Sequence, residues 1–180
     1  MAGSAYLRRA ASLLRGRTLD FGCGVGELLA KLPAGSKGLE YNPATVEFCR
    51  RAGLDVEFYD GESDHWQLST LGAEMGGQFE SMIISHVLEH LEHPRDVLNR
   101  LLWSAARLGM RRVVVIVPGR AGFRVDATHR TFIDLAYLQD ASIVCGTAFS
   151  FRGARYFPGD LRGLGDWLPH HELQVVFEKE

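Results

Sequence analysis

The sequence predicts an α/β fold, in which a doubly wound, mostly parallel sheet of seven strands carries helices on both faces and its last strand runs antiparallel. Strand and helix signals alternate along the chain, which is typical of a parallel sheet. A glycine-rich turn at 22–26 joins the first strand to a segment of helical composition. The longest aliphatic run, 113–117, is apolar throughout, as expected of a strand buried on both faces.

The first half of the chain is predicted to contain three short strands, at 18–21, 37–41 and 56–59. A helical segment at 27–32 follows the glycine-rich turn. A second helix is predicted from Pro43 to about Ala52, because Asn42 is a good N-cap, Pro43 suits the first helical position and Gly53 suits the end.

The second half is predicted to begin with a strand at 79–85, followed by the clearest helix, 94–108, whose apolar residues form one stripe. A buried strand at 112–117 and a helix at 131–140 come next. Two further strands, 146–151 and 173–178, are expected to pair antiparallel at an edge of the sheet.

All 180 residues are expected to form a single domain, 1–180, because a chain of this length buries roughly 70% of its unfolded surface in one core. The first 16 residues are arginine-rich and free of acids, as in a transit peptide. Their apolar residues also recur at helical spacing, and we prefer to interpret 1–16 as a lead-in helix packed on the domain.

Charge and cysteine content exclude several classes of protein. The formal net charge is −2 and the sequence pI is near 6.4, which disfavours a broad nucleic-acid or membrane-surface interface. No apolar run approaches the roughly 20 residues that span a bilayer. The three cysteines are widely spaced and odd in number, so we expect a reducing compartment and a cytoplasmic location.

The glycine-rich turn is suited to a nucleoside. The order strand, glycine turn, helix brings backbone N–H groups close to a ligand, and glycine is needed because any Cβ would block the approach. Glu40 ends the second strand, where a carboxylate can accept both ribose hydroxyls. Glu27 occupies the position where a dinucleotide site requires glycine, and the Gly-Lys-Ser/Thr of a phosphate-binding loop is absent. Among nucleoside ligands, this leaves one without phosphates, whose other end carries a carboxylate and a charged amine.

Two motifs resemble those of the class I S-adenosylmethionine-dependent methyltransferases. Residues 19–29, Leu-Asp-Phe-Gly-Cys-Gly-Val-Gly-Glu-Leu-Leu, resemble their first motif, and residues 38–42, Gly-Leu-Glu-Tyr-Asn, resemble their second. The order of elements matches from about residue 17 to 178. The resemblance implies a Rossmann-like fold and S-adenosylmethionine as the cofactor.

The resemblance also implies a role for each matching residue. Asp20 and the glycine turn would hold the methionine portion, Glu40 the ribose, and Tyr41 would lie against the adenine. Asp60 would accept the adenine amine, with an exposed turn aspartate as its alternative. Ser85 and His86, at the end of the fourth strand, would flank the methyl-donor sulfur. The predicted cofactor-binding residues are therefore Asp20, Gly22, Gly24, Gly26, Glu40, Tyr41, Asp60 and Ser85.

A cluster of histidines and glutamates follows the fourth strand. In one helical turn His86, Glu89 and His90 would share a face at the carboxyl edge of the sheet, and His129, after the fifth strand, could reach the same place. Imidazoles and a carboxylate can bind a divalent metal. Alternatively, one histidine serves as general base, or the cluster only packs and caps a helix.

The resemblance bears on this cluster as well. Residues 88–90, Leu-Glu-His, match an element frequent in small-molecule O-methyltransferases, including the ubiquinone-pathway group. In some relatives, among them small-RNA 2′-O-methyltransferases, two glutamates and two histidines at matching places bind magnesium. Here the first glutamate position is His86, which favours a softer metal or none. The candidate catalytic residues are His86, Glu89 and His90, and the candidate metal ligands are these three with His129.

The predicted function is methyl transfer from S-adenosylmethionine to a small-molecule acceptor through an oxygen nucleophile, with His90 or His86 removing the proton. Arginines between 120 and 155 suggest a polar or anionic acceptor, such as a glycosylated intermediate. The alternatives are a non-catalytic S-adenosylmethionine-binding subunit and a nucleic-acid methyltransferase. The sequence leaves the oligomeric state open.

Overall fold

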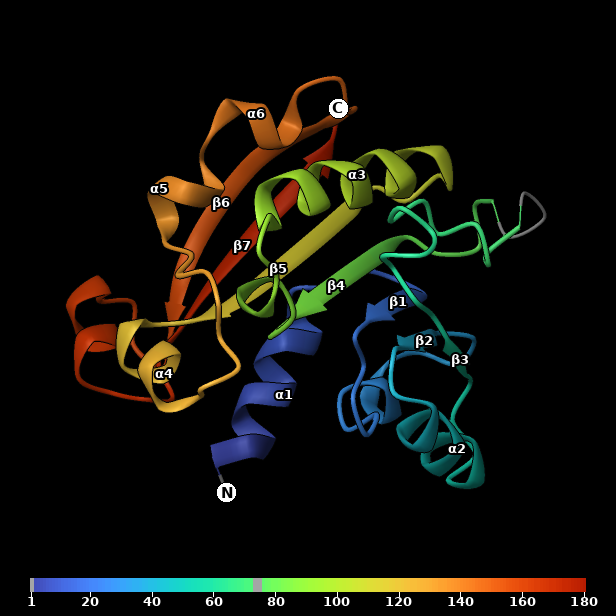
Figure 1. Ribbon diagram of the computed structural model, residues 1–180, viewed down its shortest axis with the longest axis horizontal. Coiled ribbons are helices and arrows are strands. Elements are labelled where there is room, and N and C mark those ends of the chain that lie inside the picture. The colour runs from blue at the N-terminus through green and yellow to red at the C-terminus, as the bar shows by residue number, and fades with distance from the viewer. Residues whose placement is uncertain (1, 73–75) are drawn as a thin grey trace.

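The computed structural model describes residues 2–72 and 76–180, and these contain a seven-stranded sheet in the order β3-β2-β1-β4-β5-β7-β6 (Figure 1). Strands β1 to β5 are parallel, and β7 is antiparallel to both of its neighbours. This confirms the predicted fold class. The strands are β1 (Thr18–Phe21), β2 (Lys37–Glu40), β3 (Val56–Phe58), β4 (Ser81–Ser85), β5 (Arg112–Pro118), β6 (Phe149–Phe157) and β7 (Glu172–Lys179).

Helices cover both faces of the sheet. The α-helices are α1 (Ala2–Ser12), α2 (Pro43–Arg51), α3 (Pro94–Arg107), α4 (Arg120–Val125), α5 (Leu135–Leu138) and α6 (Ala141–Val144). Three single 3₁₀ turns that matter for the site are η1 (Leu29–Lys31), η3 (Leu88–His90) and η4 (Arg162–Asp166). In Figure 1, α3 lies across one face of the central strands, and α1 lies on the opposite side.

Alternating side chains of β4 and β5 divide the core between these two helices. Met82 and Val115 pack with the apolar stripe of α3, whereas Ile83 and Val114 pack with Leu7 and Ala10 of α1. A strand presents successive side chains to opposite faces, so a run that is apolar throughout buries both. The predicted lead-in helix is thus a packed part of the domain.

Helices α2 and α3 form where the sequence predicts them. The Asn42 side chain accepts hydrogen bonds from the backbone N–H groups of Ala44 and Thr45, which caps α2, and Pro43 follows in the first turn. Pro94 likewise opens α3, and Leu98 and Leu102 on its inner face are fully buried.

Two predicted helices are wrong. Only the 3₁₀ turn η1 forms within 27–32, because the glycine-rich turn continues through Leu28 and Pro33 follows directly. The segment 131–140 is extended up to Asp134 and then forms the short helix α5. The backbone N–H groups of Arg130 and Thr131 donate to the carbonyl of Glu89 at 2.8 and 3.1 Å, and this contact with the β4–α3 loop replaces the first helical turn.

Other element boundaries also differ from the prediction, most clearly those of β4 and β6. Strand β4 begins at Ser81 rather than Phe79, and β6 extends from Phe149 to Phe157, through a bulge after Phe151, because β7 pairs along its length. Helix α4 was not predicted from the sequence. It begins directly after β5, where Gly119 donates to the carbonyl of His171 at 2.7 Å and turns the chain.

The carboxyl ends of the parallel strands meet at one edge of the sheet. Because β7 is antiparallel, it begins at this edge, and its first residue, Glu172, lies opposite Pro118 of β5. The glycine-rich turn, the histidine cluster and the start of the last strand therefore converge. Among the described residues, no helix combines the length and the apolar character needed to cross a membrane.

Candidate active site

The glycine-rich turn leaves an open space over β1. Gly22, Gly24 and Gly26 all have φ between +53° and +78°, a conformation that favours glycine. A Cβ on Gly22 would lie 2.4 Å from the Val87 side chain, but a Cβ on Gly24 would meet nothing within 4 Å. The side of the turn toward which a Cβ on Gly24 would point is therefore open and available to a ligand.

Glu40 holds the rim of this space. One carboxylate oxygen accepts from the backbone N–H of Gly24 at 3.0 Å and the other from Asn42 at 2.8 Å. Tyr41, which is 67% exposed, lies next to the exposed Phe58, with ring centroids 6.1 Å apart. The ends of β2 and β3 thus present an aromatic surface beside a fixed carboxylate, an arrangement suited to a nucleoside.

Asp20 places a buried carboxyl group beside the glycine-rich turn. Its side chain is 2% exposed, and Oδ2 has no hydrogen-bond partner among the described residues. Burial, with a further contribution from the negative charge of Glu40, raises the pKa of Asp20 to about 7. A buried carboxylate without a partner fits a cationic ligand group, such as the amine of S-adenosylmethionine.

Asp60 forms a turn. Its Oδ1 accepts from the backbone N–H groups of Glu62 and Ser63 at 3.1 and 3.2 Å, and its Oδ2 accepts from the Ser63 hydroxyl at 2.7 Å. These hydrogen bonds lower the pKa of Asp60. Both oxygens are thus engaged locally, in keeping with the alternative of a turn aspartate, and the adenine contact stays a prediction.

The hydroxyl of Ser85 is paired with that of Tyr6, with 2.5 Å between the two oxygens. Tyr6 comes from α1, and burial, with the negative charge of Glu172, raises its pKa. Its ring also meets the ring of His86 edge-on, with centroids 6.0 Å apart. The lead-in helix therefore contributes a side chain to the end of β4.

His86 is an ion-pair histidine. Its Nδ1 lies 3.2 Å from Glu89 Oε1 and its Nε2 lies 3.0 Å from Glu172 Oε1. Burial lowers the pKa of His86, but the hydrogen bonds and charges of Glu172 and Glu89 outweigh it and raise the pKa to about 9. The side chain is therefore protonated at neutral pH, and both ring nitrogens are engaged.

The structure corrects the expectation that His86, Glu89 and His90 share one helical face. His86 has φ of +55°, and only a 3₁₀ turn, η3, follows it. This left-handed residue directs the His86 ring toward β7, whereas His90 lies next to His129 with ring centroids 4.8 Å apart. Ligand atoms of Glu89, His90 and His129 lie within 4.8 Å of one another, so His129 does reach the cluster.

Hydrogen bonds assign the tautomers of His90 and His129. The Thr128 hydroxyl donates to Asp126 at 2.6 Å, so it accepts from Nδ1–H of His90 at 3.0 Å. His129 Nδ1–H donates to the Phe123 carbonyl at 2.9 Å. In the neutral rings, both Nε2 atoms then carry a lone pair, and neither Nε2 has a hydrogen-bond partner among the described residues, as a metal ligand or a base requires.

Glu89 completes this group. It is fully buried, its Oε2 has no partner among the described residues, and its Oε1 lies 4.0 Å from Nε2 of His129. A distance of 4.0 Å is too long for a hydrogen bond but leaves room for a cation between the two groups. Two imidazole lone pairs and a buried carboxylate suit a divalent metal with nitrogen and oxygen ligands.

Several contributing residues were missed by the sequence reasoning. Glu172 could have been found, because an antiparallel last strand must begin at the ligand edge. Tyr6, Phe58 and Thr128 have no comparable signal, since their contacts depend on how loops and α1 pack.

The strand order, the glycine turn beside the acidic end of β2 and the polar cluster after β4 together define an α/β site suited to a nucleoside-containing ligand. A family model described as a methyltransferase domain matches residues 3–141. The chain therefore belongs to the methyltransferase domain family, and its fold is that of the class I S-adenosylmethionine-dependent enzymes. The family and cofactor predicted from the glycine motif are confirmed.

Two curated relatives match parts of the chain. The mitochondrial ubiquinone biosynthesis O-methyltransferase of Schizosaccharomyces pombe is 32% identical over 90 residues, 48% of this chain and 32% of that protein. The ubiquinone biosynthesis O-methyltransferase of Nitrosococcus oceani is 33% identical over 98 residues, 52% and 40% respectively. The match thus spans less than half the length of either relative.

Solved structures share the fold over nearly the whole chain. A SAM-dependent methyltransferase from Archaeoglobus fulgidus superposes with a TM-score of 0.66 and 19% identity, covering 98% of this chain and 93% of that one. At this identity the likeness concerns the fold, and the acceptor has to be argued from the site.

Proposed function

We propose that the chain transfers the methyl group of S-adenosylmethionine to a hydroxyl oxygen of a small-molecule acceptor, with His90 as the general base. The observation that carries this proposal is the free Nε2 lone pair of His90 at the same sheet edge as the glycine turn. The O-methyltransferase names of the two partial relatives support an oxygen acceptor. A cytoplasmic location stays a prediction.

The cofactor supplies an activated methyl group on a sulfonium. In this proposal Asp20 faces the cofactor's amine, the carboxylate of Glu40 exchanges a backbone N–H partner for the ribose hydroxyls, and Tyr41 covers the adenine. The open space over Gly24 and the unpartnered Oδ2 of Asp20 support this assignment. Ser85, together with its partner Tyr6, would border the reacting methyl group.

With the cofactor bound, its sulfonium would supply the methyl group in exchange for the acceptor's hydroxyl proton, and Nε2 of His90 would accept that proton. Thr128 and Asp126 would stabilise the resulting imidazolium, because the Nδ1–H of His90 donates to Thr128, which donates to Asp126. His86 is less suited to this role, since both of its ring nitrogens face carboxylates.

Metal binding is the second candidate role of the cluster, favoured by the unpartnered Oε2 of buried Glu89. Glu89, His90 and His129 would hold a divalent ion, which would lower the pKa of a bound hydroxyl. His86 stands apart from this set because Glu89 and Glu172 engage it. The two candidate roles exclude each other, since a metal would occupy the lone pair that His90 needs as a base.

The first experiment is a calorimetric titration of S-adenosylhomocysteine into the protein, with and without EDTA. We expect micromolar binding in both, and no binding in either would contradict the proposal. Titration of Mn²⁺ and Zn²⁺ then tests the metal: binding that Glu89→Gln abolishes would assign the cluster to a metal, and its absence would leave His90 as the base.

Transfer of labelled methyl groups to small hydroxyl compounds separates the two rivals. Intact cofactor binding without transfer to any acceptor would favour a non-catalytic subunit. Transfer to RNA or DNA with steep salt dependence would favour a nucleic-acid enzyme.

A further inference from the structure

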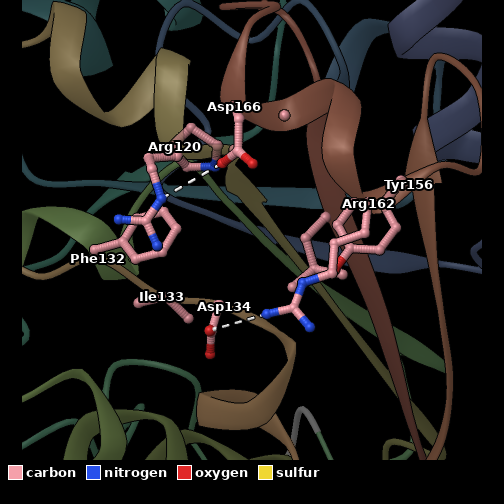
Figure 2. A pocket seen from close by; sticks show the side chains of 11 residues that line it. Arg120, Phe132, Ile133, Asp134, Tyr156, Arg162 and Asp166 are labelled. Atoms are coloured by element: carbon pink, nitrogen blue, oxygen red, sulfur yellow. Dashed lines mark ion pairs between the residues drawn. The ribbon is translucent and has the colours of Figure 1, made fainter.

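A cavity of about 160 Å³ lies at the carboxyl end of β5, between α4 and the β6–β7 connection (Figure 2). Its side walls carry Arg120, Phe132, Asp134, Tyr156, Arg162 and Asp166. This volume is below the roughly 300–1,000 Å³ of sites that enclose a drug-sized ligand. The cavity therefore takes one ring of a larger molecule, or a group of similar size.

Two arginine–aspartate pairs face this cavity. Nε of Arg120 lies 3.4 Å from Oδ1 of Asp166, and an Nη of Arg162 lies 3.6 Å from Oδ2 of Asp134. Figure 2 shows the two pairs apart from each other among the side chains that line the cavity. Each pair is joined by one long contact, so most of the guanidinium N–H groups stay available to a ligand. Oδ1 of Asp134 accepts from the backbone N–H of Tyr137 at 2.9 Å, which leaves Oδ2 of Asp134 and the carboxylate of Asp166 to accept from a ligand.

The chemistry of these pairs selects hydroxyl groups. A hydroxyl both donates and accepts, so it can accept from an arginine and donate to the paired aspartate at once. A carboxylate or phosphate can accept from the arginine but is repelled by the aspartate. An ammonium can donate to the aspartate but is repelled by the arginine. With two such pairs, the matching ligand carries hydroxyls at more than one position around a small ring.

Aromatic side chains provide apolar surface for the ring itself. The guanidinium of Arg120 lies 4.5 Å from the ring centroid of Phe132, and Tyr156 stacks on His171 at 5.4 Å with an interplanar angle of 8°. Stacking on Arg120 and on His171 fixes the positions of the Phe132 and Tyr156 rings, respectively, where they line the cavity. A sugar ring, with C–H groups on its faces and hydroxyls at its rim, matches both features.

Contacts connect the cavity to the histidine cluster. Phe132 meets Phe123 edge-on at 5.4 Å, and Phe123 stacks on His129 at 5.3 Å. On the other side, Leu173 lines the cavity, and its neighbour Glu172 pairs with His86. Two aromatic side chains, Phe132 and Phe123, therefore connect a ring held in the cavity to His129 of the cluster.

We propose that this cavity binds a sugar ring of the methyl acceptor through the Arg120–Asp166 and Arg162–Asp134 pairs. The inference rests on the proposed function, since it makes the cavity part of the acceptor site. It narrows the acceptor to a glycoside or another molecule that carries a polyhydroxylated ring.

Saturation-transfer NMR tests the proposal without an acceptor in hand. The probes are the methyl glycosides of glucose, mannose, galactose and rhamnose, with benzoate and inorganic phosphate as anionic comparisons, each with the protein saturated with S-adenosylhomocysteine. We expect ring-proton saturation for at least one glycoside. Arg162→Gln and Asp166→Asn should each weaken its binding about tenfold, the loss expected for a hydrogen bond to a charged group.

Arg155→Gln is the matched control, because Arg155 is exposed on β6 next to Tyr156 but outside the cavity. It should leave glycoside binding unchanged. The proposal would be overturned if no glycoside showed saturation, or if Arg155→Gln weakened glycoside binding as much as the cavity variants do. It would also be overturned if only benzoate or phosphate bound in a way that the cavity variants weaken. S-adenosylhomocysteine affinity, measured on the same samples, tests the proposed function separately.

Discussion

His86 and His90 lie four residues apart, but their surroundings give them different chemistry. The positive φ of His86 directs its ring between Glu89 and Glu172, where it carries a proton at neutral pH. His90 is held by Thr128 at Nδ1 and keeps its Nε2 lone pair. The positive φ of His86 therefore places its ring in an ion pair, whereas the ring of His90 stays available as a candidate base.

Replacing His90 should lower the rate of methyl transfer and spare cofactor binding. We expect His90→Gln to reduce kcat by about 10²–10⁴-fold, the usual contribution of general-base catalysis, with the affinity for S-adenosylhomocysteine within about twofold. His170→Gln is the matched control, because the His170 side chain is exposed and lies outside the cluster of Glu89, His90 and His129. Unchanged turnover in His90→Gln would remove His90 from the catalytic residues.

Asp20 should make cofactor binding depend on pH. Its raised pKa of about 7 means that it is neutral below pH 7 and charged above. The affinity for S-adenosylhomocysteine should therefore increase from pH 6 to pH 8, by up to about tenfold per unit on the acid side, because binding the amine requires the charged form. Calorimetry across this range measures the effect.

Asp20→Asn is the control for this pH dependence. The amide cannot ionise, so affinity should be lower and nearly constant over the same range. A pH dependence that persists in the variant would assign the titration to another group.

At the scale of elements, alanine at a glycine of the glycine-rich turn has two separable effects: backbone strain, which lowers stability, and a Cβ in the proposed cofactor space, which lowers affinity. Gly24 and Gly53 both have positive φ, and a Cβ on either would meet nothing within 4 Å. Alanine should therefore cost the protein about 1–2 kcal/mol of unfolding free energy at either position. Only Gly24 faces the proposed cofactor space.

We accordingly expect Gly24→Ala and Gly53→Ala to shift the urea midpoint by similar amounts, whereas Gly24→Ala alone weakens S-adenosylhomocysteine binding by tenfold or more. Denaturation and calorimetry on the two variants measure both quantities. Equal affinities would mean that the turn does not contact the cofactor.

Elements with strong local signals could be predicted, and elements set by tertiary contacts could not. Helix α3 has a buried stripe and an opening proline, and β5 is apolar throughout, so their sequences specify them. The segment 131–140 has helical composition, but its first residues hydrogen-bond to Glu89, far away in the sequence. No local pattern contains that information.

At the scale of the whole molecule, the site draws on both ends of the chain. The glycine turn and Glu40 could be predicted because they follow neighbouring parallel strands. Tyr6 could not be assigned from local sequence, because its contact with Ser85 spans 79 residues. The antiparallel direction of the last strand places Glu172 at the ligand edge, but its pairing with His86 spans 86 residues and has no local signal. The cofactor half of the site was thus accessible to sequence reasoning, and the partners of the acceptor half were not.

Cofactor binding should stabilise the whole domain by mass action. S-adenosylhomocysteine at 100 times its Kd contributes about 2.7 kcal/mol. For a chain of this size each kcal/mol raises Tm by about 2–4 °C, so we expect an increase of about 5–10 °C in a thermal-shift assay. Gly53→Ala should show the same increase from a lower starting Tm, and no increase in the unmodified protein would contradict binding to the folded state.

The place of β7 also bears on how the protein is made. The ribosome synthesises β7, residues 172–179, after all the other strands of this sheet, although β7 lies between β5 and β6. While the nascent chain lacks them, the edge of β5 has no partner and His86 has no Glu172. The cofactor side can assemble early during translation, whereas the acceptor side is completed in one late step, and a chain terminated before residue 172 would have an unpaired strand edge open to association with other chains.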